Sequence, residues 1–133
     1  MKFSTRTTYG LRAIVRLAKN WGKGSLSLPS IARAENISLG YLERLFSKLK
    51  KADFIIAEKG VSGGYTLSKS PQKINILEIV EVLEGKMAVF YCLDANGKIS
   101  CSSGCKCSAS LVLSKVQKAI SEVLKKIKLS DLT

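Results

Sequence analysis

The strongest constraint on the fold of this chain is the apolar pattern of residues 39–51. Large apolar side chains recur there at spacings of three and four residues, which gathers them on one face of a helix: Leu42, Leu45, Phe46 and Leu49. A phenol and three cations occupy the opposite face: Tyr41, Arg44, Lys48 and Lys51. The pattern therefore predicts a helix that buries one face in a core and presents a basic face outward.

A shorter helix precedes this one. Ser27 can cap its first turn, and Pro29 is tolerated in a first turn because its missing N–H has no helical partner there. We expect the helix to end near residue 35, where Asn36 tolerates the left-handed backbone of a tight turn, and we expect Ser38 to cap the next helix. This is a helix-turn-helix pattern, although an ordinary amphipathic surface helix would produce part of it.

A glycine-rich hairpin follows the two helices. Residues 53–58 and 65–67 favour β-strands, and a basic loop that starts at Lys59 joins them. Glycines let a backbone approach phosphates or enter the minor groove. The segment is typical of a DNA-binding wing, and the alternative is a loose surface hairpin. Further helices are expected at residues 3–20 and 74–84, the second of them stopped by Gly85.

The charge of the chain indicates the class of partner. Its 22 Lys and Arg residues outnumber its 10 Asp and Glu residues, for a net charge of +12. This excess favours a polyanion, either nucleic acid or an acidic membrane surface, over a merely solvated basic surface. No signal peptide is recognisable, and no apolar run approaches the ~20 residues of a membrane span. We therefore expect a cytoplasmic protein without a membrane partner.

All four cysteines lie between residues 92 and 107, at Cys92, Cys101, Cys105 and Cys107. The segment is too poor in apolar residues to be ordered by burial. In a cytoplasmic chain, clustered cysteines are more often metal ligands or redox thiols than structural disulfides. The chain contains no histidine, which excludes His-assisted catalysis and His-containing metal sites. We therefore expect no enzyme, and thiolates would select a soft metal or an iron–sulfur cluster.

Residues 108–128 are predicted to form a long helix with a wide apolar stripe: Leu113, Val116, Ile120, Val123 and Ile127. A partner helix from a second subunit is the simplest cover for this stripe, and packing within the chain is the alternative. The expected fold is mostly α with a small β-hairpin wing. A winged helix-turn-helix domain spans residues 1–85, a cysteine-rich loop spans 86–107, and a dimerisation helix with its tail spans 108–133.

Three motifs in this chain resemble the bacterial winged-helix transcriptional regulators of the IscR/NsrR type. Residues 1–13 resemble the first helix of that family, 37–49 its recognition helix and 60–67 its wing, while 129–132 match its closing pattern. The resemblance implies a homodimer that binds palindromic double-stranded operator DNA. Relatives use the positions of Ser38, Tyr41 and Glu43 at bases or phosphates. The remaining DNA-binding candidates come from the basic face and the wing: Arg44, Lys48, Lys51, Lys59, Gly60, Ser62, Gly63 and Gly64.

Family members that hold a cluster use three cysteines before the long helix, and Cys92, Cys101 and Cys107 match them. Cys105 is an extra thiol and a further candidate ligand. The family's fourth ligands do not carry over, because Ser110 and Thr8 occupy their positions. The resemblance implies a regulator that senses redox state, iron or nitric oxide through an iron–sulfur cluster, with 2Fe–2S favoured over 4Fe–4S. The alternatives are a zinc site, a disulfide switch and, from another class, an iron–sulfur carrier.

Overall fold

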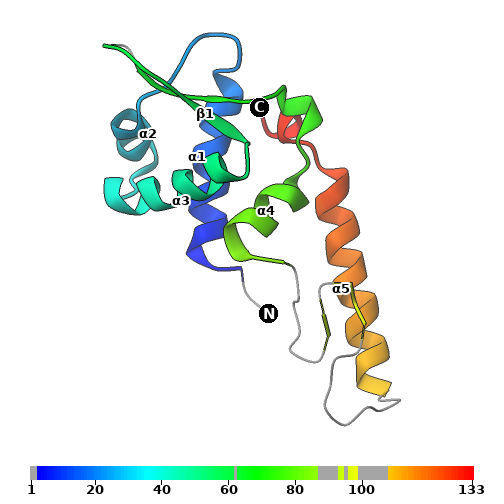
Figure 1. The fold of residues 1–133 in the computed structure, drawn as a ribbon. Helices are drawn as coiled ribbons and strands as arrows, with labels where there is room; N and C mark the ends of the chain where they lie inside the picture. Colours follow the sequence, from blue (N-terminus) through cyan, green and yellow to red (C-terminus); the bar gives the residue numbers. More distant parts are fainter. Residues whose placement is uncertain (1–2, 62, 87–92, 95, 99–107) are drawn as a thin grey trace.

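The computed structural model describes residues 3–61, 63–86, 93–94, 96–98 and 108–133. The helices and the hairpin form a head, and one long helix runs alongside it and beyond it (Figure 1). The elements in chain order are α1 (Thr5–Lys19), α2 (Leu28–Glu35), α3 (Leu39–Lys51), β1 (Ile55–Glu58), β2 (Gly64–Leu67), the 3-10 turn η1 (Pro71–Lys73), α4 (Ile76–Glu84), α5 (Ser108–Lys126) and the 3-10 turn η2 (Leu129–Leu132).

Polar caps explain where the first four α-helices start. A side-chain oxygen of each capping residue accepts a hydrogen bond from a backbone N–H of the first turn, and the four caps are Ser4, Ser27, Ser38 and Asn75. Asn36 adopts the left-handed conformation, with φ of 55°. The predicted capping roles of Ser27 and Ser38 and the predicted turn at Asn36 are therefore confirmed.

Several predicted boundaries were wrong by a few residues. Helix α4 starts at Ile76 rather than at residue 74, because Asn75 forms a capping box with Glu78. Helix α5 ends at Lys126 rather than at residue 128. The chain beyond it pairs with the start of α4, where the Ile76 N–H donates to the carbonyl of Ile127 at 2.9 Å. Strand β1 starts at Ile55 rather than at residue 53, because Asp53 has a positive φ of 64° and forms a turn.

The hairpin is anchored to the segment between α1 and α2. Its two strands are antiparallel, with Ile55 opposite Leu67. Leu26 exchanges two backbone hydrogen bonds with Tyr65, of 3.0 and 2.8 Å. A Cβ at Gly64 would lie 2.3 Å from the carbonyl oxygen of Leu26, so this close approach requires glycine. Strand β2 is therefore paired with β1 on one side and with Leu26 on the other.

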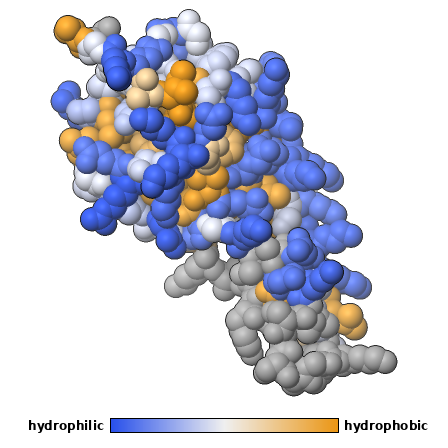
Figure 2. All heavy atoms as spheres, viewed as in Figure 1, coloured by the Kyte–Doolittle hydropathy of each residue, from blue (hydrophilic) through white to orange (hydrophobic). Residues whose placement is uncertain are grey.

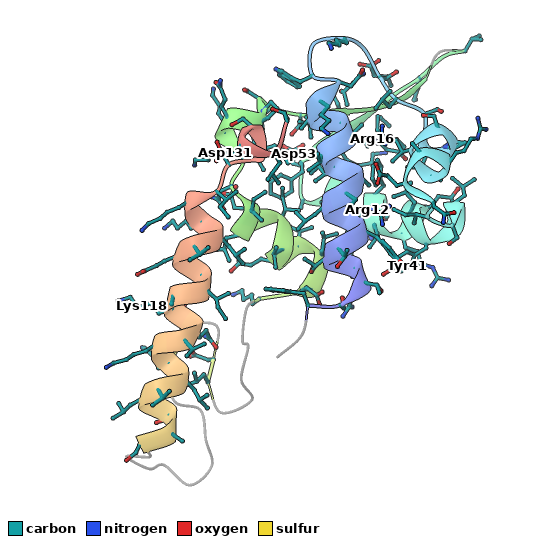
Figure 3. All side chains as sticks on the ribbon, turned by 180° about the vertical axis from the view of Figure 1, so that it is seen from behind. Arg12, Arg16, Tyr41, Asp53, Lys118 and Asp131 are labelled. Carbon is teal, nitrogen blue, oxygen red and sulfur yellow. The ribbon has the colours of Figure 1, made fainter. Side chains whose placement is uncertain are left out.

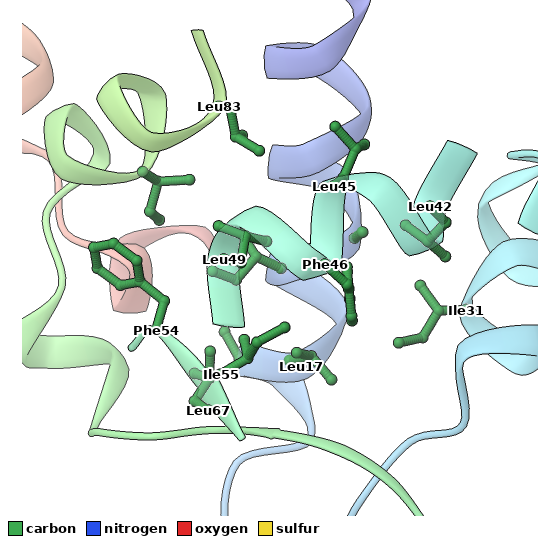
Figure 4. Packing of buried hydrophobic residues seen from close by; sticks show 14 of the residues in the cluster. Leu17, Ile31, Leu42, Leu45, Phe46, Leu49, Phe54, Ile55, Leu67 and Leu83 are labelled. Carbon is green, nitrogen blue, oxygen red and sulfur yellow. The ribbon is translucent and has the colours of Figure 1, made fainter. Parts of the chain in front are cut away.

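A single hydrophobic cluster fixes the orientation of α3. Figure 4 shows side chains of α1, α2, α3, α4 and both strands converging on this cluster. The four apolar residues predicted for the inner face of α3 are all buried: Leu42, Leu45, Phe46 and Leu49. Each such side chain contributes roughly 1.5–3 kcal/mol when it leaves water. Because this face is held in the core, the opposite face of α3 stays in solvent.

Helix α5 keeps only part of its apolar surface against the head. Ile120 and Leu124, together with Ile127 just after the helix, pack against the core, whereas Leu111, Val112 and Val123 are more than half exposed. The surface view shows both hydrophilic and hydrophobic colouring around α5 (Figure 2). The stripe therefore does not pack wholly within the chain in this structure. Within the described ranges, no helix has the length and apolar character needed to cross a bilayer.

Candidate nucleic-acid interface

The outward face of α3 carries three cations around an open hollow of about 560 Å³. Its lining residues are Gly40, Glu43, Arg44, Ser47, Lys48 and Lys51. The side chains of Arg44, Lys48 and Lys51 are all exposed, as the helical spacing predicted, and so is that of Glu43. The three cations can bind phosphates, and the carboxylate of Glu43 can accept a hydrogen bond from a base.

Tyr41 differs from the sequence prediction, because it is half-buried rather than simply outward-facing. Its hydroxyl lies 3.2 Å from the Oγ1 of Thr5 on α1. Its ring meets the ring of Tyr9 edge-on, with centroids 5.9 Å apart. The Arg12 guanidinium in turn lies 5.6 Å from the centre of the Tyr9 ring. Tyr41 is thus positioned by α1 beside the basic face, on the side of the head shown in Figure 3.

Two arginines of α1 hold the end of α2. The Nε of Arg12 donates to Glu35 Oε2 at 3.0 Å, and the Nε of Arg16 donates to Glu35 Oε1. The hydrogen bond from Arg16 is the main reason why the pKa of Glu35 lies below its ordinary value. Burial of the carboxyl opposes that effect, and Arg12 reinforces it. These ion pairs attach the end of α2 to α1. The sequence reasoning missed them because the partners lie 19 and 23 residues apart.

The wing turn has a backbone that only glycine suits. The Gly63 N–H donates to the carbonyl of Gly60 at 2.9 Å, and Gly60 has φ of +124°. A Cβ at Gly63 would lie 2.7 Å from the carbonyl oxygen of Glu58. Lys59 is exposed at the start of this turn, whereas the predicted contact residue Ser62 lies outside the described residues. The wing turn thus presents the cation of Lys59 beside glycine backbone at Gly60 and Gly63.

Tyr65 links the wing to α3. Its ring meets Phe46 of α3 edge-on, with centroids 5.1 Å apart and planes at 90°. Tyr65 is also the residue that pairs with Leu26. Helix α3 and the wing are therefore held together through an aromatic contact. The sequence analysis identified Tyr65 as a strand residue and did not predict this contact.

Glu84 joins the end of α4 to the start of α1. Its Oε1 accepts hydrogen bonds from the backbone N–H and hydroxyl of Ser4 and from the hydroxyl of Thr7, and its Oε2 lies 3.5 Å from Arg6 Nη2. Burial raises the pKa of Glu84, but the hydrogen bonds from Ser4 and Thr7 outweigh it, so that the pKa lies below its ordinary value. This carboxylate precedes the cysteine-rich segment by only a few residues.

A short turn between the first two cysteine positions packs on α5. Leu93 is buried, and the Nε2 of Gln117 donates to the carbonyl oxygen of Asp94 at 2.8 Å. The hydroxyl of Ser114 donates to the carbonyl oxygen of Gly97 at 3.2 Å. The segment next to the predicted ligands is therefore attached to the predicted dimerisation helix.

The predicted metal ligands Cys92, Cys101, Cys105 and Cys107 lie outside the described residues. Among the residues that the structure does describe, no group of three or more metal-ligating side chains occurs. The assignment of these cysteines therefore stays a prediction from sequence. The choice of Cys92, Cys101 and Cys107 is what the family resemblance implies, and the absence of histidine leaves thiolates as the soft ligands.

The sequence pattern of the Rrf2 family, described as an iron-dependent transcriptional regulator, matches residues 3–133. The chain belongs to the Rrf2 family. CymR of Bacillus subtilis is 43% identical over 88 residues, which span 66% of this chain and 64% of that relative. The solved structure of the same protein, described as the global cysteine regulator, has a TM-score of 0.85 at 33% identity and covers 99% of this chain and 95% of CymR.

A second solved structure is similar to this Rrf2 regulator. IscR of T. potens has a TM-score of 0.79 at 36% identity, covering 99% of this chain and 85% of that one. The match confirms the resemblance drawn from the sequence and the winged helix-turn-helix fold. The protein is a DNA-binding transcriptional regulator, in keeping with the basic face of α3.

Proposed function

We propose that this Rrf2 regulator binds a palindromic operator as a homodimer and that an iron–sulfur cluster on its cysteines controls the binding. The observation that carries the DNA-binding half is the exposed basic face of α3, braced to the wing through Phe46 and Tyr65. The cluster half depends on four cysteines within one segment and on the similarity to an IscR structure.

We infer different roles for the exposed residues of α3. The major groove of B-DNA admits a helix, and the exposed cations Arg44, Lys48 and Lys51 can reach phosphates at its edges. Glu43 can accept a hydrogen bond from cytosine N4, which would make it a reader of sequence. Ser38 and Tyr41 lie at the start of the helix, where a side chain meets base edges or the backbone. Lys59, Gly60, Gly63 and Gly64 belong to the wing, and Ser62 is proposed with them from sequence alone.

A second copy of the chain supplies the cover for α5. Its exposed apolar residues are Leu111, Val112, Val116 and Val123. A two-fold dimer pairs identical faces, so one such helix can cover the other. The two copies of α3 must then meet major grooves about 34 Å apart. A small change in how the α5 helices pack would alter this spacing and with it the affinity for the operator.

The donor set of the cysteine-rich segment fits an iron–sulfur cluster. Cysteine thiolates are the usual soft ligands of such clusters, and without histidine they are the soft donors that this segment offers. Cys92, Cys101 and Cys107 would hold the cluster, with Cys105 as an additional candidate, and the bound group would supply sensitivity to oxidation, nitric oxide or iron supply. The contacts of Gln117 and Ser114 with the turn at residues 94–97 connect this segment to α5. A 2Fe–2S cluster is favoured over 4Fe–4S.

The cluster is tested by purification without oxygen and reconstitution with iron and sulfide. We expect visible absorbance together with iron and acid-labile sulfide. Cys92→Ala, Cys101→Ala and Cys107→Ala should each lose most of the iron, and Cys105→Ala is compared with them to decide its role. Zinc in place of iron and sulfide would contradict the proposal.

A metal-free thiol switch is the second candidate. It is favoured by the similarity to CymR of Staphylococcus aureus, of which an oxidized form has been solved, with a TM-score of 0.78 at 33% identity. In that case oxidation would join two of the four cysteines in a disulfide. Mass mapping of the cysteines after mild oxidation, carried out on iron-free protein, distinguishes the two: a defined disulfide that alters DNA affinity supports the switch.

A further inference from the structure

An apolar side chain stands alone at the tip of the wing. Val61 has a relative exposure of 112%, the highest among the exposed large hydrophobic side chains of the described residues. Turn positions of this kind usually carry Gly, Asn, Asp or Ser. The side chain of Val61 does not contribute to the stability of the fold, because no part of it is buried.

The backbone holds Val61 away from the head. The hydrogen bond from Gly63 to Gly60 closes the turn around it, and the positive φ of Gly60 and the tight approach of Gly63 to Glu58 fix its shape. Figure 1 shows the hairpin extending past α2, with its tip clear of every helix, and the tip is coloured as hydrophobic in Figure 2. The tip therefore cannot fold back onto the core without breaking these contacts.

The position of the tip relative to α3 is also fixed. Tyr65 packs on Phe46 and pairs with Leu26, so the wing and α3 approach a duplex together. With α3 in the major groove, we expect the wing to lie over the neighbouring groove. The minor groove is about 6 Å wide, which suits a narrow turn flanked by glycines.

We propose that Val61 is an apolar wedge that contacts the minor groove beside each half-site and favours a flexible pyrimidine–purine step there. This inference rests on the proposed binding of DNA. Apolar side chains that enter the minor groove unstack flexible steps more easily than stiff A-tracts. Lys59, two residues earlier and exposed, can hold the adjacent phosphate while Val61 presses on the sugar edges and the step. The operator would then be read partly through its deformability.

The test uses the full-length protein and an operator selected with it from random duplexes. Two versions of that operator differ only at the flanking step, one with TA and one within an A-tract. We expect the wild type to prefer the TA version by about 5-fold or more at fixed salt. Val61→Thr, which replaces one methyl group with a hydroxyl, should reduce this preference to within about 2-fold, and Val61→Ile should keep it. Since Val61 is fully exposed, neither variant should change folding stability.

A second readout reports the wedge itself. With 2-aminopurine at the flanking step, the wild type should raise the fluorescence on binding, and Val61→Thr should not. An unchanged TA preference in Val61→Thr, or no preference in the wild type, would overturn the inference while leaving the DNA-binding proposal standing. A change in dimerisation rather than in step preference would assign Val61 to a protein contact and also overturn it. If the wild type selects no duplex, both the proposed function and this inference fail.

Discussion

The ring of Tyr65 stands at 90° to the ring of Phe46, with the two centroids 5.1 Å apart. This contact joins the wing to the buried face of the recognition helix. A winged-helix protein must place both elements on DNA at once, and the contact fixes their relative position before binding. Part of the free energy of DNA binding would otherwise be lost in ordering the wing.

Replacing the ring of Tyr65 tests this contact. Tyr65→Leu should lower the free energy of unfolding by about 1 kcal/mol, because edge-to-face pairs contribute roughly 0.5–1.5 kcal/mol beyond burial. It should also weaken operator binding, since the wing loses its support on α3. Tyr65→Phe keeps the ring and is the control. Chemical denaturation and DNA titration measure the two effects, and equal DNA affinity of Tyr65→Leu and Tyr65→Phe would contradict the account.

Gly64 should tolerate no larger residue. A Cβ there would lie 2.3 Å from the carbonyl oxygen of Leu26, which is backbone and cannot move aside alone. We expect Gly64→Ala to lower the free energy of unfolding by about 1–3 kcal/mol. Gly40→Ala is the matched control, because nothing lies within 4 Å of its added Cβ and α3 gains helix propensity. Thermal unfolding of both variants measures the difference in stability. If Gly64→Ala is as stable as the wild type, the close approach of Gly64 to Leu26 does not constrain the base of the wing.

The link between Glu84 and α1 should make stability depend on pH. The folded-state pKa of Glu84 is lowered from 4.5, so its contribution is fully present above that pH and is lost as pH falls through the folded-state pKa. Glu84→Gln should cost about 1.5–3 kcal/mol at pH 7, and the difference from wild type should shrink below about pH 4.5. Glu81→Gln, an exposed carboxylate on the same helix, is the control. A difference that stays constant with pH would mean that the charge of Glu84 does not matter.

Experiments should distinguish the proposed phosphate contact of Lys48 from the proposed base contact of Glu43. Lys48→Ala should weaken binding to all duplexes and lower the slope of log affinity against log salt by about 1, since one phosphate contact is lost. Glu43→Ala should instead change which base pairs are preferred, with a smaller effect on overall affinity. Titrations at several salt concentrations and selection from random duplexes measure these effects. If Glu43→Ala keeps the original preference, Glu43 does not read bases.

Local sequence signals predicted the framework of the site, and contacts between distant residues were not predictable. The spacing of Leu42, Leu45, Phe46 and Leu49 was sufficient for the buried face of α3, and the caps at Ser27 and Ser38 marked the helix starts. These signals act within a few residues of the chain. The half-buried position of Tyr41 depends on Thr5 and Tyr9, and the role of Glu84 depends on Ser4 and Thr7. Only the folded core brings such partners together.

If the cluster controls operator binding, the affinity for DNA must depend on cluster occupancy, and measuring one against the other tests this directly. One preparation, reconstituted without oxygen, is converted stepwise to the apo form with a chelator, and the iron content and the operator dissociation constant are measured at each step. We predict that the dissociation constant changes by about 10-fold between the full and empty states, in proportion to iron content, while dimerisation persists. A dissociation constant that stays the same from full occupancy to none would contradict the account.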